Sequence, residues 1–541
     1  MADLTFDAVM VGGGSKTLIT AMYLAKYGGM SVGIFDEQLE LGGGWAVDET
    51  PAPGFFHNTC SMAQGRYHHL PLWEDFPDFE VKGARFYPLC MPCIFKEDHS
   101  SMMFYNRYWD PTQEKTAKTM AQFSERDADT WLTLWQMWLG ILRPAFLKRM
   151  YTPAPPADQL DALEEMLTNP VLARLIDPHW MILSFVQVAN LLFESPEVRF
   201  WIYRFGTTWA LPIEYPGTGM AVFFLVMSTE ADLGVGGSHN LCHACLRVLA
   251  DYKARTFTKC CVDKILVENG RAVGVRLADG SEVAARKLVV TNVSPSQLVE
   301  LVGTENISDT IVRKVNNIIV DFDPELWYGW AMHEAPDYIA AKYNPDINTL
   351  ASAVVLGERN PERIIREWRL AHAKILVHDP VLYAWCFTLA DPTQGPPGKH
   401  VGGTCAWALP ANAMSEREWL KYKEEHAEYV INTWQQYAPN MTWDNIIGYD
   451  ARTAYDICRL SNMRPGGNPC VIDLFPQQVG KYRPIPELAQ HRVPGIEGLY
   501  ATGSAWPPMA SSWSAQAYNC YKIIAEDLNL EKPWQKEGRP F

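Results

Sequence analysis

Several features that would place this chain in a familiar class are missing from its sequence. No stretch of about 20 apolar residues reads as a membrane-spanning helix, although 48% of the 541 residues are hydrophobic. Basic residues are outnumbered by acidic ones, 47 to 62, and the formal net charge is −15. This balance argues against a nucleic-acid partner and against docking to an anionic membrane by charge alone. We find no internal repeat, low-complexity linker or secretory leader, so we expect a cytoplasmic protein.

The 12 cysteines do not require disulfide bonds or a metal ion. Without a secretory leader we expect them to be reduced thiols. Cys90 and Cys93 form one Cys-x-x-Cys pair, and Cys242 and Cys245 form another. The four thiols together, or the two histidines at 68–69, could bind a metal ion. Small buried thiols and imidazoles that line a cofactor explain these residues better, so we predict no metal site.

The strongest pattern in the chain lies in its first 45 residues. A β-prone apolar run over 6–11 leads into three glycines at 12–14, and a helix-spaced apolar run follows. A second strand over 31–35 then ends at Asp36. This order of strand, glycine turn, helix, strand and acid opens a Rossmann-type dinucleotide-binding domain. The glycines let the backbone approach a pyrophosphate, the helix N-terminus favours its charge, and Asp36 is placed to bind an adenosine ribose.

A second glycine cluster at 42–44, followed by Trp45, points to a flavin and not to a nicotinamide cofactor. Thr17 stands where the fingerprint has its third glycine, which loosens the demand for close packing of helix on strand. We therefore predict bound FAD, with a glycine-rich turn in an ordinary α/β domain as the alternative. No further glycine unit of this kind follows Gly44, so we do not expect a built-in NADPH site.

The rest of the chain mixes helices and strands, and its length exceeds the ~250–300 residues over which one core grows. Apolar runs between prolines over 86–104 predict strands of a second sheet, and a long helical region follows over 116–150. Its segment 131–139 is apolar on nearly every side. We interpret it as a buried helix, with the wall of a lipophilic channel or a membrane-surface patch as alternatives. Two tight turns within 262–291 predict a β-meander, and 511–528 predicts a final helix.

These segments, in order along nearly the whole chain, resemble the phytoene desaturase / carotenoid isomerase family of FAD-dependent oxidoreductases. The matching motifs are Val11–Ala25 with Asp36–Gly43, Pro216–Gly219, Val235–Ser238 with Val262–Asn292, Asp391–Thr393, Pro465–Asn468, Arg483–Leu488 and Gly498–Asn519. The resemblance implies an α/β fold with a discontinuous Rossmann-type FAD-binding domain over 1–80, 232–305 and 440–541. A mixed α+β substrate-binding domain would occupy 81–231 and 306–439.

The resemblance also implies which residues hold FAD. They are Gly12, Gly14, Ser15, Lys16, Asp36, Glu37, Gly43, Gly44, Trp45, Val262, Gly503, Ser504, Ser511, Ser512 and Trp513. In the family, the proline that corresponds to Pro508 precedes three glycines close to the flavin ring. Here the side chains of 509–513 replace those glycines and narrow the space over the ring, which suggests a substrate other than a long linear polyene.

The substrate is expected to be apolar, an isoprenoid or an alicyclic compound, because charges are scarce over 185–215 and tryptophan is frequent. We expect a dehydrogenase, or desaturase, that passes a hydride to flavin N5 while a base removes a neighbouring proton. The alternatives are a redox-neutral double-bond isomerase or saturase that uses reduced FAD, and a non-catalytic flavoprotein partner subunit. A quinone, an electron-transfer protein or oxygen would re-oxidise the flavin. Peripheral membrane contact and a homo- or hetero-oligomer stay open.

Three polar residues are the candidate catalytic groups. Arg204 and Glu214 are isolated charges in the aromatic stretch 200–219, and Asp391 belongs to a motif that matches the family. A carboxylate within hydrogen-bond reach of the substrate could accept its proton. Each residue also has a structural interpretation, since Arg204 and Glu214 could pair with one another or meet solvent, and Asp391 could cap the turn over 392–393.

Overall fold

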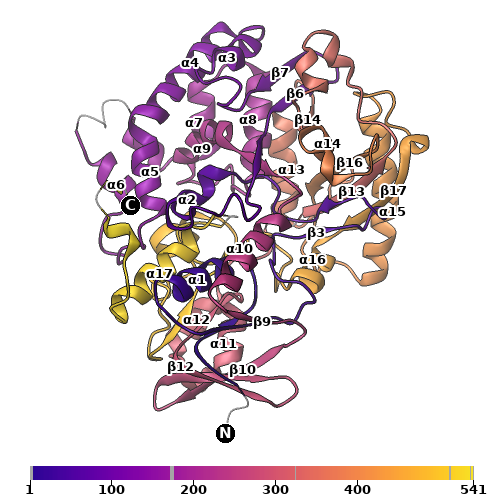
Figure 1. Ribbon diagram of the computed structural model, residues 1–541. Helices are drawn as coiled ribbons and strands as arrows, with labels where there is room; N and C mark the ends of the chain where they lie inside the picture. The colour runs from indigo at the N-terminus through magenta and orange to yellow at the C-terminus, as the bar shows by residue number, and fades with distance from the viewer. Residues whose placement is uncertain (1–3, 171–175, 323–324, 511–512, 537, 540) are drawn as a thin grey trace.

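Two seven-stranded sheets organise the chain in the computed structural model (Figure 1). The structure describes residues 4–170, 176–322, 325–510, 513–536, 538–539 and 541. In Figure 1 the first sheet lies at the bottom, the second at the right, and a layer of helices at the upper left.

The first sheet has the order β10-β11-β12-β1-β2-β9, and β18 pairs with β12. Its strands are β1 (Leu4–Val11), β2 (Val32–Phe35), β9 (Arg255–Phe257), β10 (Val262–Glu268), β11 (Arg271–Leu277), β12 (Glu282–Thr291) and β18 (Leu499–Ala501). β1 runs parallel to β2 and β12, and β18 runs parallel to β12. Three helices pack together beside this sheet, α1 (Ser15–Lys26), α10 (His239–Asp251) and α17 (Ala515–Asp527). This is the predicted Rossmann-type arrangement.

The predicted β-meander forms β10, β11 and β12, which pair antiparallel in sequence. Asn269 and Gly270 join the first two strands with φ angles of +50° and +73°. These left-handed values suit the tight hairpin turn for which Asn-Gly is the favoured sequence. The predicted helix over 511–528 is α17, which begins at Ala515; Ser511 and Ser512 lie outside the described residues.

The second sheet has the order β17-β13-β16-β15-β14-β6-β7. Its strands are β6 (Met91–Phe95), β7 (Ser101–Phe104), β13 (Glu325–Met332), β14 (Ala353–Gly357), β15 (Tyr383–Cys386), β16 (His400–Trp407) and β17 (Ile446–Arg452). The long helix α15 (Glu416–Trp434) packs its buried side chains into the same core as β13. β17 pairs antiparallel with β13, so the chain up to Arg452 belongs to the second sheet. The sequence analysis places this part of 440–541 in the FAD-binding domain, with the first sheet, and the structure corrects that boundary.

The helical region over 116–150 is divided into α3 (Glu114–Ala121), α4 (Glu125–Met137), a π-helical turn over 138–142 and α5 (Arg143–Met150). In the apolar segment 131–139, the side chains of Trp131, Trp135 and Trp138 are buried. The interpretation of this segment as a buried helix is therefore confirmed for its three tryptophan side chains.

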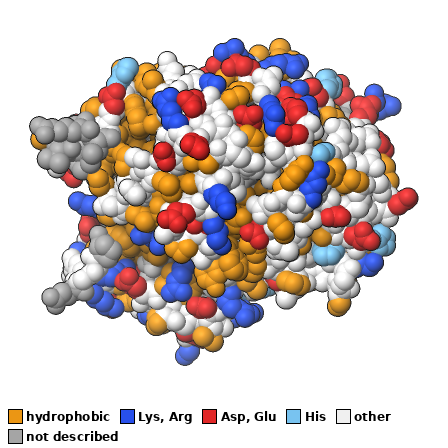
Figure 2. Space-filling view, turned by 90° about the horizontal axis from the view of Figure 1, so that it is seen from above, with side chains coloured by type: hydrophobic (Ala, Val, Ile, Leu, Met, Phe, Trp, Pro, Cys, Tyr) orange, Lys and Arg blue, Asp and Glu red, His pale blue; other side chains and the backbone are white. Residues whose placement is uncertain are grey.

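The remaining elements connect these layers. They are β3 (Val47–Asp48), β4 (His57–Asn58), α2 (Leu70–Asp75), β5 (Phe86–Pro88), α6 (Ala162–Leu167), α7 (Phe185–Leu192), α8 (Pro196–Thr208), α9 (Phe223–Met227), β8 (Asp232–Gly234), α11 (Pro295–Val302), α12 (Asp309–Asn316), α13 (Glu362–His372), α14 (Phe387–Ala390) and α16 (Ala454–Ser461). Among the described residues, none of these helices or the others has the length and apolarity to cross a bilayer. The face seen from above carries acidic and basic side chains interspersed among apolar ones (Figure 2).

Candidate functional site

A cavity of about 620 Å³, here called the dinucleotide cavity, lies where β1, β2 and β12 of the first sheet end. Most of the residues predicted to hold FAD line it: Gly12, Gly14, Ser15, Lys16, Asp36, Glu37, Gly43, Gly44, Val262, Gly503 and Ser504. The fold thus brings together segments from the beginning, the middle and the end of the chain at the carboxyl ends of parallel strands, where ligands bind in open α/β sheets.

The glycine turn at the edge of this cavity has no room for side chains. A Cβ atom on Gly12 or on Gly14 would lie 2.2 Å from a side-chain atom of Asn292. Gly12 also has a φ angle of +85°, which L side chains rarely adopt. From the other side, a Cβ atom on Gly43 would lie 3.2 Å from the Cα atom of Gly14. The two glycine clusters therefore pack backbone against backbone.

The N-terminus of α1 is arranged to receive an anion. Its N-cap residue, Gly14, supplies no side-chain hydrogen bond, and its first turn contains no acidic residue. The first N–H groups of a helix have no partners within the helix, so they attract negative charge. Lys16 adds a buried amine, and burial lowers its pKa to about 7. Thr17, in place of the third glycine, places its hydroxyl 2.6 Å from the carbonyl oxygen of Gly12 and is fully buried.

Asp36 lies at the end of β2 as predicted, and its carboxylate also holds the turn. Its Oδ2 accepts the backbone N–H of Gly13 at 2.5 Å, and its Oδ1 accepts that of Gln38 at 2.7 Å. Both bonds orient the carboxylate at the wall of the dinucleotide cavity. A free lone pair on each oxygen is left for a ribose hydroxyl.

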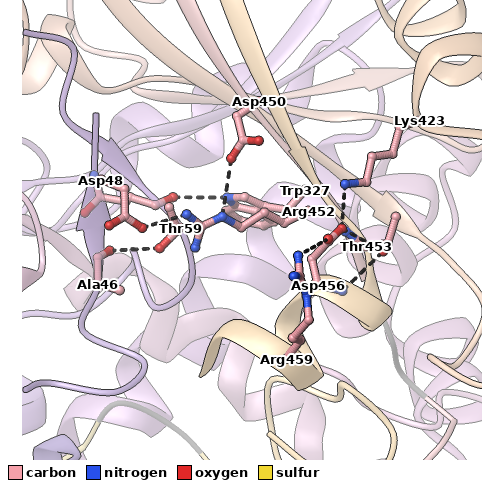
Figure 3. Close-up of polar contacts among 11 residues, drawn as sticks. Ala46, Asp48, Thr59, Trp327, Lys423, Asp450, Arg452, Thr453, Asp456 and Arg459 are labelled. Carbon is pink, nitrogen blue, oxygen red and sulfur yellow. Dashed lines mark hydrogen bonds and ion pairs between the residues drawn. The ribbon is translucent and has the colours of Figure 1, made fainter. Parts of the chain in front are cut away.

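Arg452 extends the wall of this cavity from the second sheet. Its guanidinium lies 2.7 Å from Asp48 Oδ2 and 3.3 Å from Asp450 Oδ2, and Figure 3 shows it between the two carboxylates. Asp48 is part of β3, whereas Asp450 is part of β17. This ion pair therefore ties the second sheet to the segment that follows the second glycine cluster.

Two smaller cavities continue from the dinucleotide cavity. The middle cavity, of about 190 Å³, shares Ser15, Lys16, Gly44, Met463 and Ser504 with the dinucleotide cavity. The apolar cavity, of about 160 Å³, shares Ala63, Thr208, Trp209 and Glu325 with the middle cavity. Much of its wall is aromatic or sulfur-containing: Cys60, Met62, Met91, Phe205, Trp327, Tyr383, Trp385 and Cys405. The three cavities thus form one series, from the glycine turn to an apolar compartment.

The remaining predicted FAD contacts are placed differently. Trp513 lines the middle cavity together with Ala510, so part of the segment 509–513 does face the space beyond the glycine turn. Trp45 is buried with its ring centroid 5.6 Å from that of His69, and it lines none of the three cavities. Ser511 and Ser512 lie outside the described residues.

Glu214 is separated from this series of cavities. Its two carboxylate oxygens accept hydrogen bonds of 2.6 and 2.7 Å from the guanidinium of Arg369, so its partner is not Arg204. Arg204 is buried, and its Nη1 donates to the hydroxyl of Thr208 at 2.7 Å. Its guanidinium lies 5.7 Å from the ring centroid of Tyr383. Because Thr208 and Tyr383 line the apolar cavity, Arg204 lies directly behind its wall.

Asp391 caps a turn, as its structural interpretation proposed. Its carboxylate accepts the backbone N–H groups of Gly236, at 2.5 Å, and Thr393, at 3.1 Å. It also accepts the hydroxyl of Thr393 and the side-chain amide of Gln394. The carbonyl oxygen of that amide accepts a hydrogen bond from Asn58 on β4. Asp391 therefore links the second half of the chain to the strand that follows the glycine clusters.

One carboxyl group at the cavities has no role in the sequence predictions. Glu325, the first residue of β13, lines both the middle and the apolar cavity. Burial raises its pKa to about 7, an effect that the positive charge of Arg204 opposes. The only sequence signal is its position directly before the apolar run 326–332, as the last of three acids in 321–325.

The paired cysteines and adjacent histidines are buried, Cys90, Cys93, Cys242, Cys245 and 68–69 alike. Burial lowers the pKa of both imidazoles, which holds them neutral. Within the described ranges, no group of three or more His, Cys, Asp or Glu side chains is placed to hold a metal ion.

Comparisons with known proteins agree with this architecture. No protein-family model matches the chain. It is 24% identical to the mouse pyridine nucleotide-disulfide oxidoreductase domain-containing protein 2, over 97% of this chain and 94% of that protein. It is 22% identical to one of the subunits of limonene dehydrogenase from Castellaniella defragrans, over 98% of this chain and 96% of that protein.

Solved structures are also similar over nearly the whole chain. An oxidoreductase from Methanosarcina mazei has a TM-score of 0.56 at 15% identity, covering 97% of this chain and all of that one. Cyclohexylamine oxidase from Brevibacterium oxydans has a TM-score of 0.58 at 12% identity, covering 97% and 99%. The chain thus has the α/β oxidoreductase fold predicted from its sequence, with a Rossmann-type dinucleotide-binding half and a substrate half. The narrower resemblance to phytoene desaturases stays a prediction.

The glycine turn generates a first prediction. Gly14→Ala should destabilise the protein because the new Cβ meets Asn292, and Asn292→Ala in the same chain should restore most of the loss. Gly12→Ala should stay destabilised in the Asn292→Ala background by about 1–2 kcal/mol, because its φ of +85° is left-handed. Chemical unfolding of the single and double variants, with Asn292→Ala as the control, measures this. Equal recovery of the Gly12 and Gly14 variants would show that φ is not the constraint.

A second prediction compares Asp391 and Glu214, the two carboxylates proposed from the sequence as catalytic groups. Asp391→Asn should lower the free energy of unfolding by about 1–3 kcal/mol, since a buried acceptor of several hydrogen bonds becomes partly a donor. Glu214→Gln should lower it by only about 0–1 kcal/mol, because its pair with Arg369 is exposed. Urea unfolding followed by fluorescence compares the two. An Asp391→Asn protein of full stability would contradict the capping role.

Proposed function

We propose that this chain binds FAD along the dinucleotide and middle cavities and dehydrogenates an apolar, isoprenoid or alicyclic substrate. The observation that carries the proposal is the series of three cavities with shared lining residues, which begins at the glycine turn and ends between aromatic side chains. The similarity to the Castellaniella limonene dehydrogenase chain, whose name describes a dehydrogenase acting on a cyclic hydrocarbon, supports the same interpretation.

The residues present suit FAD. The N–H groups at the start of α1 and the amine of Lys16 would bind the diphosphate, while Asp36 and Glu37 would bind the ribose. Val262 would meet the adenine through its backbone. When bound, FAD supplies an acceptor for a hydride, that is, for a hydrogen nucleus with two electrons. The backbone packing of the two glycine clusters leaves the close approach that a diphosphate needs.

The chain's contribution to the reaction is positioning in a dry compartment. Phe205, Trp327, Tyr383 and Trp385 line the apolar cavity, and such a wall excludes water while it orients a hydrocarbon. A volume of about 160 Å³ suits a compact ring better than an extended polyene. Because the Castellaniella relative is named as a subunit, its similarity favours assembly with a second chain and electron transfer to a quinone, a carrier protein or oxygen.

A panel of compounds tests the proposal in a single anaerobic experiment. Purified protein, reconstituted with FAD where needed, should be yellow, and cyclic terpenes should bleach it while linear polyenes do so far more slowly. Alcohols, ketones and amines of similar size serve as controls for a different bond type. Re-oxidation is then followed with a quinone and with oxygen.

Three results would overturn the proposal in different ways. Protein that stays colourless after reconstitution would rule out FAD. Turnover of an alkene only after the flavin has been reduced chemically would indicate an isomerase or saturase. Absence of turnover in either redox state, with FAD bound, would indicate a non-catalytic partner subunit.

A further inference from the structure

Glu325 lies at the junction between the cofactor and substrate compartments. It lines the middle cavity, which Ser15, Lys16 and Gly44 connect to the dinucleotide cavity, and it lines the apolar cavity on the other side. A compound in the apolar cavity would therefore lie beside this carboxyl group and next to the middle cavity, the compartment that adjoins the dinucleotide cavity.

No other Asp or Glu among the described residues lines either of these two cavities. The carboxyl group of Glu325 also has no hydrogen-bond or ion-pair partner in the described part of the chain. In contrast, Asp391 and Glu214 are engaged in structural hydrogen bonds. An unpaired carboxyl group in an apolar wall is costly for stability, so its presence points to a chemical use.

Among the described residues, six titratable groups face Glu325 or share its cavities: Arg204, Tyr383, Cys60, Cys405, Cys470 and Lys16. Arg204, on α8, favours the carboxylate form. The thiols of Cys60 and Cys405 have raised pKa values because of burial, so both stay neutral. Lys16, on α1, lines the middle cavity with a pKa of about 7. Glu367, on α13, lies behind Arg204 and lines neither cavity.

We propose that Glu325 is the proton acceptor of the dehydrogenation, an inference that rests on the proposed function. One C–H bond of the substrate breaks as a proton moves to the Glu325 carboxylate, and its electron pair forms the new C=C bond. The neighbouring C–H bond would lose its hydrogen with two electrons, as a hydride for which bound FAD would supply the acceptor. The carboxylic acid then releases the proton to water before the next turnover. Arg204 acts as a positioning residue, since its charge keeps part of Glu325 ionised.

The central experiment is Glu325→Gln in the FAD-loaded protein, with flavin reduction followed in single turnover. The rate should fall by about 10²–10⁴-fold while the visible spectrum of bound FAD is kept. Because the base works as the carboxylate, the wild-type rate should rise with pH through about 7 and then level off. The Gln variant should be slow and independent of pH in this range. A rise through neutral pH that persists in the Gln variant would assign the ionisation to another group with a pKa of about 7, such as Lys16 or Glu367, and overturn the proposal.

Two further variants are matched controls. Glu325→Asp keeps the charge but withdraws it by one methylene, so it should recover part of the rate and the pH dependence. Glu367→Gln changes another buried carboxyl group whose pKa is raised to about 7 but which lines neither cavity, and should leave the rate within about twofold of wild type. If the Glu367 variant were as slow as the Glu325 variant, the loss of rate would come from a disturbed Arg204, the neighbour of both carboxyl groups, and not from a missing proton acceptor.

A readout independent of turnover is the infrared difference spectrum between about pH 5 and about pH 9. Carboxyl absorption that titrates near pH 7 should lose the component of Glu325 in Glu325→Gln but not in Glu325→Asp, while the components of Glu367 and Asp232 remain in both variants. If wild-type flavin is reduced and the Gln variant is equally fast, the inference fails and the proposed function stands. If no compound reduces the wild-type flavin, the proposed function fails, and the inference with it.

Discussion

The approach of two glycine backbones is the constraint on which the rest of the structure depends. Residues 12–14 and 42–44 touch without side chains between them, and Asn292, just after β12, covers the turn from the third side. A Cβ atom at 12 or 14 would collide with that amide. Because this contact joins the ends of β1 and β12 to the segment after β2, it fixes the floor of the dinucleotide cavity. The positions of Lys16, Asp36 and the middle cavity follow from it.

The half that contains the second sheet is joined to this floor by a shared apolar core and by polar bridges, and not by a continuous sheet. Asp391 reaches Gly236 in the segment before α10, and Gln394 beside it reaches Asn58. Arg452 from β17 reaches Asp48 on β3. The contacts of Gln394 with Asn58 and of Arg452 with Asp48 both end on the stretch that follows the second glycine cluster. Together with the apolar core that both halves share, they hold the wall that carries Glu325 next to the middle cavity.

The predictable parts of the molecule are those whose cause is local. The glycine turn with α1 and the Asn269–Gly270 hairpin follow from short-range geometry, and both form as predicted. The partner of Glu214 was not predictable, because Arg369 is a distant residue on α13 and any exposed arginine would have served as well in the sequence. The role of Glu325 was even harder to predict from the sequence. Its distinguishing property is the lack of a partner inside an apolar wall, which only the packing of β13 against α8 and the segment around Cys60 reveals.

The placement of β17 and β18 near the end of the chain has a consequence for synthesis on the ribosome. Each sheet takes one strand from the last hundred residues, since β17 completes the second sheet and β18 the first. β1, which emerges first, finds its partner β12 only after about half of the protein has been made. Neither sheet can be completed until most of the chain has left the ribosome. Nascent chains should therefore spend much of translation with unpaired strand edges, a state in which chaperones protect against association.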